Sequence, residues 1–498
     1  MPCTTILVGK KASYDGSTMI ARNDDSGSGH FTTKKLAVVL PKDQPRHYKS
    51  VLSHVEVDLP DNPMRYTCIP NVTPGKGVWP TAGVNEDNVA MTATETITSN
   101  ERVLGADPLV ELQKEEGRKG RRGYKPEVPG GIGEEDLVLL TLPYIHSARE
   151  GVERLGFLHE TYGTYETNGI GISDVNEIWW FESVGGHHWI ARRVPDDAYV
   201  TMPNQFGIDD FDLDDALGEQ KNFMCSKDMK TFLEKYHLDL TMDGHTFNAR
   251  DAFGSHSDAD HCYNTPRAWF MQRYFNPTSN KWDGPDADYN PESDNIPWCR
   301  VPEKKITVED VKYILSSYYQ GTPYNPYAGH GSDELRGAYR YIGVNRTDDM
   351  ALLQLRPYMQ KALQPVEWLC FASNAFNVFC PQYTCVNRVP AYLGGTTDEV
   401  STDSFYWTSR LIGALADAHY GRCIQHIERY QESVGAKGHE YLNRYDAAFT
   451  DDTDAESWCE KANEDIAAMV RKEAQSALDH VLFEATSGMK NQYARNDR

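Results

Sequence analysis

Short apolar runs bounded by turn residues characterise the first 200 positions of the chain. Residues 3–8 form one such run, 13–16 supply turn chemistry and 17–21 return, which together predict a hairpin. Residues 36–40 predict another strand, and 82–96 predict two strands joined by a turn at 85–88. Four more strands are predicted from the runs GIGISD, EIWWFES, HHWIARRV and DAYVTM, which are separated by turn signals.

Helical periodicity appears first between positions 134 and 159 and again from 405 to the end of the chain. Residues 101–134 are dense in charge and glycine and predict an exposed insertion, whereas 207–345 predict short helices among acidic loops. Residues 367–393 return to strands. Because the strands fall in two blocks and do not alternate regularly with helices, we expect an α+β fold with antiparallel sheets.

Composition narrows the classes of function. The chain has 498 residues, enough for one large domain or for two to three, and a net charge of −23. That charge disfavours nucleic acid or an anionic membrane surface as a partner. The sequence shows no apolar run of membrane-spanning length and no secretory signal. Its ten cysteines form no CxxC pair, which is typical of reduced thiols, so we expect a cytoplasmic protein.

The predicted hairpin brings the thiol of Cys3 near a charged cluster that includes Arg22 and Asp25. A tight turn at Asp15-Gly16 would place Cys3 opposite residues beyond Asp25, whereas a wider loop would bring Arg22 closer. The cluster could be only a salt bridge at a strand end, and Cys3 only a packed apolar residue. If Met1 and Pro2 were removed, however, Cys3 would carry a free α-amine.

That amine would give Cys3 its own general base. An α-amine has a pKa of about 7.7–8.0 and a thiol one of about 8.5, so the two groups can exchange a proton at neutral pH. N-terminal nucleophiles of this kind need no catalytic histidine. A neighbouring arginine would favour the thiolate.

The segment CTTILVGKKASYDGSTMIARNDD resembles the start of the N-terminal-nucleophile (Ntn) dipeptidases of the dipeptidase A type, to which the secernins are related. More distantly it is similar to the choloylglycine hydrolases. The resemblance implies a four-layer αββα sandwich over residues 3–400, with insertions near 101–134 and 207–345, and a helical extension over 401–498. It also implies hydrolysis of dipeptides with a free amino terminus through a thioester at Cys3, without a cofactor or a metal. A homo-oligomer is compatible with it.

The resemblance assigns further roles residue by residue. The Arg-x-x-Asp pair of that group matches Arg22 and Asp25, and its aspartate contacts the amine of the nucleophile. Its oxyanion asparagine matches Asn204 in YVTMPNQF, and a downstream arginine matches Arg267 in NTPRAWF.

Two departures from the group's pattern affect these expectations. Relatives with an oxyanion asparagine on the strand after the NEDN turn would place it at Glu95, and a carboxylate cannot donate to an oxyanion unless it is protonated. We expect Glu95 instead to bind the substrate's α-ammonium group, the alternative being a solvated glutamate at a strand end. Pro2 is the second departure, because removal of Met1 alone would leave proline before Cys3.

Other clusters of potential ligands predict no metal site. His256, Asp258, Asp260 and His261 lack HExxH or zinc-ribbon spacing, which favours a polar loop. His187 and His188 lie in a predicted strand, so their side chains should face opposite sides.

Two alternative functions remain. One is an amide hydrolase of the same fold that acts on acylated amines, and the other is a non-catalytic secernin-like binding protein.

Overall fold

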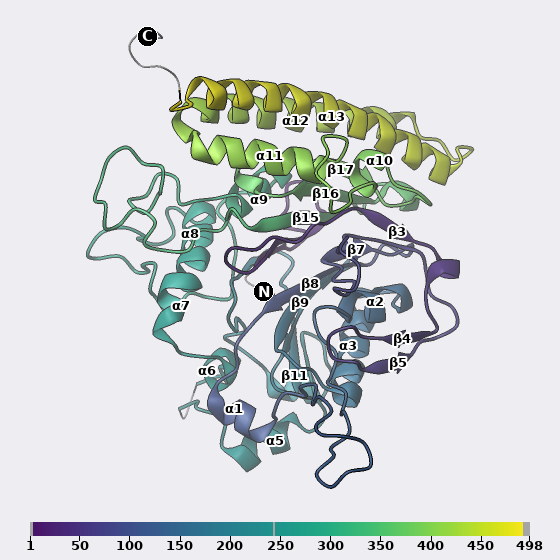
Figure 1. The fold of residues 1–498 in the computed structure, drawn as a ribbon. Coiled ribbons are helices and arrows are strands. Elements are labelled where there is room, and N and C mark those ends of the chain that lie inside the picture. Colours follow the sequence, from purple (N-terminus) through teal and green to yellow (C-terminus); the bar gives the residue numbers. More distant parts are fainter. Residues whose placement is uncertain (1–2, 243–244, 492–498) are drawn as a thin grey trace.

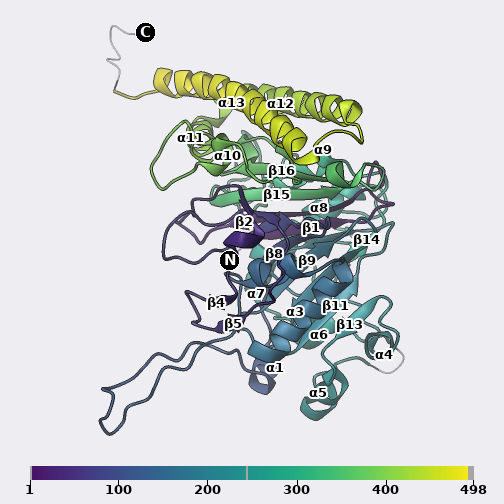
Figure 2. The ribbon, with the colours of Figure 1, turned by 90° about the vertical axis from the view of Figure 1, so that its right-hand side faces the viewer.

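The computed structural model describes residues 3–242 and 245–491, and the predicted loss of Met1 and Pro2 lies outside this range. Its helices and strands are stacked in layers (Figure 2). The long C-terminal helices lie on one sheet, a second sheet lies beneath the first, and α3 lies against the far side of the second sheet. This mixture of helices and sheets confirms the predicted α+β class.

The larger sheet has seven strands within the described ranges, and it contains both arms of the N-terminal hairpin. In spatial order its strands are β14 (Cys299–Arg300), β12 (Tyr199–Met202), β1 (Thr4–Val8), β2 (Thr18–Asp25), β15 (Thr347–Leu355), β16 (Pro365–Phe371) and β17 (Cys380–Tyr383). Each of these strand pairings is antiparallel, as predicted. β2 is buried along its whole length because it lies at the centre of this sheet.

The second sheet has six strands in the part of the chain that the structure describes. Its order is β13 (Phe223–Cys225), β11 (Trp189–Arg193), β10 (Ile178–Ser183), β9 (Asn168–Ser173), β8 (Ala90–Thr96) and β7 (Ala82–Val84). The four runs of residues that predicted strands at 168–202 therefore form β9 to β12. Two small pairs complete the strands: β3 (Ala37–Val39) with β6 (Tyr66–Cys68), and β4 (His47–Lys49) with β5 (Glu56–Asp58).

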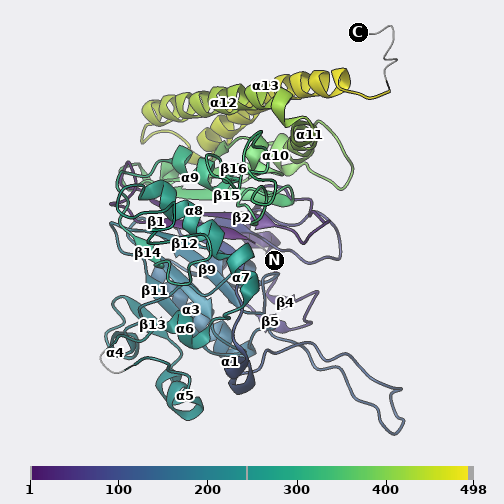
Figure 3. The ribbon, with the colours of Figure 1, turned by 90° about the vertical axis from the view of Figure 1, so that its left-hand side faces the viewer.

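The helices gather at the two outer faces and along one side of the sheets (Figures 1 and 3). They are α1 (Glu101–Ala106), α2 (Leu137–Thr141), α3 (Ala148–Tyr162), α4 (Leu213–Leu217), α5 (Met229–Tyr236), α6 (Ala249–Phe253), α7 (Asp258–Tyr263), α8 (Thr265–Phe275), α9 (Val308–Leu315), α10 (Ala391–Gly394), α11 (Phe405–Ala418), α12 (Tyr420–Ala448) and α13 (Ala455–Ser487). Short 3₁₀ turns occur at Pro41–Asp43, Leu142–Tyr144, Lys361–Leu363 and Asn374–Phe376.

The C-terminal helices share a core with the larger sheet. Buried side chains from Ile6 on β1 to Val481 on α13 belong to one continuous apolar cluster. The predicted helical extension is therefore packed on the sheet, while its boundary near residue 400 stays a prediction. None of the described helices is both long and apolar enough to span a membrane.

The two predicted insertions differ in how deeply their residues are buried. Residues 113–128 form a mostly exposed hairpin that projects from the molecule (Figure 2). Within 207–345, by contrast, α8 is almost fully buried and carries Arg267 into the interior.

Two details of the sequence interpretation require correction. The strand patterns missed β15, whose apolar run follows the polar residues Thr347, Asp348 and Asp349, and also the short strands β4, β5, β6, β13 and β14. The expectation for His187 and His188 is wrong, because both residues precede β11. Their Nδ1 atoms both approach the Asp107 carboxylate, at 3.4 and 2.8 Å.

Candidate active site

The register of the N-terminal hairpin brings Cys3 beside the charged cluster. Thr4 pairs with Asn23 and Thr5 with Arg22, so Cys3 precedes the first pair and lies beside Asp24. This register corresponds to the predicted alternative with a wider loop, in which Arg22 lies closer to Cys3. The loop is wide because the backbone N–H groups of Gly9 and Lys11 donate to the carbonyls of Ala198 and Asp196.

The guanidinium of Arg22 connects three side chains around the thiol. Its Nη2 lies 3.0 Å from Cys3 Sγ, 2.8 Å from Asp24 Oδ1 and 3.0 Å from Glu134 Oε1. Nη1 donates to the carbonyls of Ala93 and Thr81, at 2.7 and 3.2 Å. With five hydrogen bonds in a buried setting, Arg22 is held in one orientation toward the sulfur.

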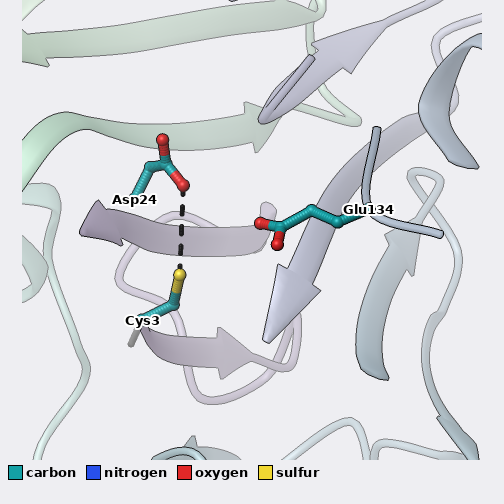
Figure 4. Close-up of side chains that lie close together, drawn as sticks. All are labelled: Cys3, Asp24 and Glu134. Atoms are coloured by element: carbon teal, nitrogen blue, oxygen red, sulfur yellow. Dashed lines mark hydrogen bonds between the residues drawn. The ribbon is translucent and has the colours of Figure 1, made fainter. Parts of the chain in front are cut away.

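Asp24 and Glu134 reach the thiol from different parts of the chain (Figure 4). Cys3 Sγ points toward Asp24 Oδ1 at 3.9 Å, and the Glu134 carboxylate is directed at the same region from a loop before α2. Ligand-type atoms of these three residues lie within 4.8 Å of one another, which is a spacing that could hold a metal ion. Arg22 Nη2 already contacts all three, so its guanidinium supplies the positive charge at this point.

A second arginine fixes the backbone of Cys3. Arg267 Nη1 donates to the Cys3 carbonyl and, at 2.7 Å, to Thr4 Oγ1. Its Nη2 donates to Asn204 Oδ1 at 2.8 Å, and the same oxygen accepts from the Cys3 backbone N at 3.1 Å. Burial lowers the pKa of Arg267 to about 10, which keeps it charged at neutral pH. Asn204 and Arg267 thus meet at Cys3, as the resemblance implied.

Asp25 lies on the other face of β2. Its carboxylate accepts from Thr347 Oγ1 at 2.6 Å and pairs with Arg340, whose Nη1 lies 3.4 Å from Thr4 Oγ1. Side chains alternate along a strand, so positions 22 and 24 share the face of Cys3 and position 25 does not. Asp24 is therefore the acid beside the thiol, and strand alternation could have identified it. The predicted contact of Asp25 with the amine of Cys3 stays a prediction.

Glu95 is buried, so the alternative of a solvated glutamate is wrong. Its Oε2 accepts from Thr5 Oγ1 at 2.7 Å, and Thr5 faces the same side of β1 as Cys3. Burial raises the pKa of the Glu95 carboxyl to about 7, although Arg267 and Arg22 oppose the shift. Glu95 therefore holds a proton for part of the time at neutral pH.

The electrostatics leave the Cys3 thiol protonated at neutral pH. Burial raises its pKa above the ordinary value, the Arg22 guanidinium opposes this, and the carboxylates of Asp24 and Glu95 add to it. Asp24 itself stays ionised, because Lys34 and Arg22 lower its pKa despite burial. Nucleophilic attack by Cys3 would consequently need a base that removes the proton during the reaction.

A cleft of about 760 Å³ opens beside this cluster. Asn204 forms part of its wall together with residues from 96–104 and 255–264, and Asn204 Nδ2 donates to the Thr96 carbonyl at 2.9 Å. His256 and Asp260, which were considered as metal ligands, line the cleft. Asp260 accepts from Ser257 N at 3.2 Å and so caps α7, in agreement with the polar-loop interpretation.

Sequence reasoning missed four members of the site, namely Asp24, described above, and three others. Glu134 and Lys34 carry no local signal, since each reaches Arg22 or Asp24 only through the tertiary fold. Asn264, which accepts from Arg267 Nη2 at 2.6 Å, lies one helical turn before it in the run NTPR.

Comparisons with known proteins identify relatives of this chain. The family described as Peptidase family C69 matches residues 2–433. A "Dipeptidase" of Bifidobacterium longum is 58% identical over 440 residues, covering 88% of this chain and 81% of that protein. A "Probable dipeptidase A" of Streptococcus pyogenes is 50% identical and covers 100% of both chains. A "Probable dipeptidase B" of Lactococcus lactis is 43% identical and covers 99% and 98%.

Proposed function

The chain belongs to peptidase family C69, and from this premise we propose that it hydrolyses dipeptides with Cys3 as an N-terminal nucleophile. The observation that carries the proposal is the geometry at Cys3. Its sulfur lies 3.0 Å from a buried guanidinium, and its backbone N donates to Asn204 in the wall of a cleft. A new N-terminus at Cys3 would place the α-amine between its own thiol and the cleft.

The proposed reaction has two stages. The α-amine takes the thiol proton as the sulfur attacks the peptide carbonyl, and Arg22 stabilises the developing thiolate. The tetrahedral adduct then collapses, the amine returns the proton to the departing amino acid, and a thioester remains on Cys3. Water, deprotonated by the same amine, hydrolyses the thioester and restores the thiol.

Asn204 and Arg267 supply the rest of the proposed machinery. The Asn204 amide lies at the boundary between Cys3 and the cleft, where an N–H donor can stabilise the oxyanion. Arg267 is the positioning residue, because it binds both the Cys3 carbonyl and Asn204. Asp25, which pairs with Arg340, would contact the new α-amine of Cys3.

Two broader assignments belong to the proposal. The stacked helix and sheet layers support assignment of the fold to the Ntn sandwich. The protein is also proposed to be located in the cytoplasm.

The mass and N-terminal residue of purified, active protein test the proposal. We expect the active chain to begin at Cys3, because only then does the α-amine base exist. Titration with a cysteine-directed inhibitor would show whether the fraction of chains that begin at Cys3 equals the fraction of active sites. Full activity in chains that retain Met1 and Pro2 would contradict the proposal.

Glu95 is proposed to recognise the free α-ammonium group of the substrate. Replacing it with glutamine should raise KM for a free dipeptide about tenfold and change kcat little, since a charge-assisted hydrogen bond is lost. Because the Glu95 pKa is about 7, KM in the wild type should fall as pH rises through 7, when the carboxylate forms, and Glu95→Gln should remove this dependence.

The N-acetylated form of the same dipeptide is the control for this variant. It has no ammonium group, so its kinetics should be the same in the wild type and in Glu95→Gln. An unchanged KM for the free dipeptide would refute the role of Glu95, and a preference of the wild type for the acetylated form would favour an acylase.

A further inference from the structure

Two cysteines outside the catalytic cluster lie together where α13 is fastened to the larger sheet. Cys385 is partly exposed just after β17, and Cys459 is buried in the second turn of α13. Arg65 links the two segments, because its Nη2 lies 3.8 Å from Cys385 Sγ and its Nη1 lies 2.6 Å from Glu456 Oε1, one helical turn before Cys459. Cys459 Sγ itself lies 3.9 Å from the Ala362 carbonyl. None of these residues contributes to the proposed mechanism.

The backbone around the two thiols is held firmly in place. Asn463, one helical turn after Cys459, binds both the N–H and the carbonyl of Tyr383 at 2.8 Å. Glu460 accepts from the Asn387 backbone N at 3.1 Å. The contacts on both sides of the thiols keep them adjacent, because one face of α13 binds the segment from 383 to 388.

The charges around the pair make the two thiols unequal. The neighbouring Cys459 thiol and, after it, the Arg65 guanidinium lower the pKa of Cys385 to about 7, although burial opposes this. The neighbouring Cys385 thiol and burial raise the pKa of Cys459, which stays protonated. A thiolate that solvent can reach, next to a second thiol, is the arrangement of a peroxide-sensitive pair.

We propose that Cys385 and Cys459 form a redox modification site that closes to a disulfide in the presence of a hydroperoxide. The Cys385 thiolate attacks the peroxide oxygen, the O–O bond breaks, and Cys385 becomes a sulfenic acid. The hydroxide or alkoxide that leaves takes a proton from solvent and becomes water or an alcohol. Cys459 then attacks the Cys385 sulfur, its proton leaves with the hydroxyl as water, and the S–S bond forms. The disulfide joins α13 covalently to the segment after β17.

Peptide mapping of the full chain after treatment with hydrogen peroxide tests the linkage. Trypsin should release residues 362–388 joined to 445–461, with the loss of two hydrogens, when free thiols are alkylated beforehand. The linked pair should be present in the wild type and in Cys380→Ser, a control in the same peptide. It should be absent from Cys385→Ser and Cys459→Ser. Absence from the wild type, or persistence in Cys385→Ser, would overturn the proposal.

The rate of alkylation of Cys385 as a function of pH provides an independent measurement. Its midpoint should lie near 7 in the wild type and should rise in Cys459→Ser. A midpoint that is the same in the wild type and in Cys459→Ser would overturn the proposal. Cys385→Ser should retain full dipeptide hydrolysis. The proposal of a redox site can therefore be confirmed or refuted independently of the proposed function.

Discussion

Replacing Cys3 with alanine is expected to lower kcat/KM for dipeptides on the order of 10⁴-fold or more, as removal of a catalytic nucleophile does in other hydrolases. The variant loses the atom that forms the thioester, and neither Arg22 nor Asn204 can substitute for it. Cys3→Ser should also be strongly impaired, because the buried site must then deprotonate a far weaker acid than a thiol. Initial rates on a free dipeptide measure both effects.

Cys68→Ala is the matched control, since Cys68 is also buried, lies in β6 and is not among the hydrogen-bond partners of Arg22. Both alanine variants should unfold at similar denaturant concentrations, and Cys68→Ala should keep its activity. Activity in Cys3→Ala close to that of the wild type would exclude the nucleophile assignment. Loss of activity together with an intact fold and intact binding of a dipeptide would confirm it and exclude the non-catalytic binding protein.

Replacing Arg22 with methionine is expected to destabilise the fold by roughly 3–5 kcal/mol, the cost of removing one partner from a buried ionic cluster. Asp24 would keep Lys34, at 3.2 Å, but would lose the guanidinium, as would Glu134. Hydrolysis should fall at least 100-fold as well, because the thiolate would lose the cation that stabilises it. Urea unfolding and initial rates measure the two effects separately.

The pH dependence of stability gives this prediction a definite sign. The Asp24 pKa is lowered in the folded state, so the stability that this group contributes is present above its unfolded pKa of about 3.9 and is lost as pH falls through the folded value. Arg22→Met weakens that contribution. The difference in stability between the two proteins should therefore narrow in acid, as the carboxylates become protonated.

A double variant separates charge burial from catalysis. Adding Glu134→Gln to Arg22→Met removes a negative charge that Arg22 had balanced, and should restore part of the stability without restoring hydrolysis. Arg22→Lys keeps the charge but cannot reach the five acceptors and should fall between the wild type and Arg22→Met in both assays. If Arg22→Met were as stable as the wild type, the buried cluster would not have the role assigned to it.

Local patterns in the sequence determined most of the strands and part of the site. Alternating and apolar runs predicted β9 to β12 because neighbouring side chains along a strand face opposite sides of a sheet. The hairpin brought Cys3 and Arg22 together because they lie on adjacent antiparallel strands of one local unit. The resemblance added Asn204 and Arg267, which contact Cys3 in the structure.

Only the tertiary structure decided the register of the hairpin and which acid faces the thiol. The wide loop depends on hydrogen bonds with residues 196 and 198, nearly 200 positions away, and this register places Asp24 beside Cys3. Glu134 and Lys34 join the cluster through long-range packing, and burial raises the pKa of Glu95. Such features depend on desolvation and on contacts between distant segments, which a local pattern of residues does not encode.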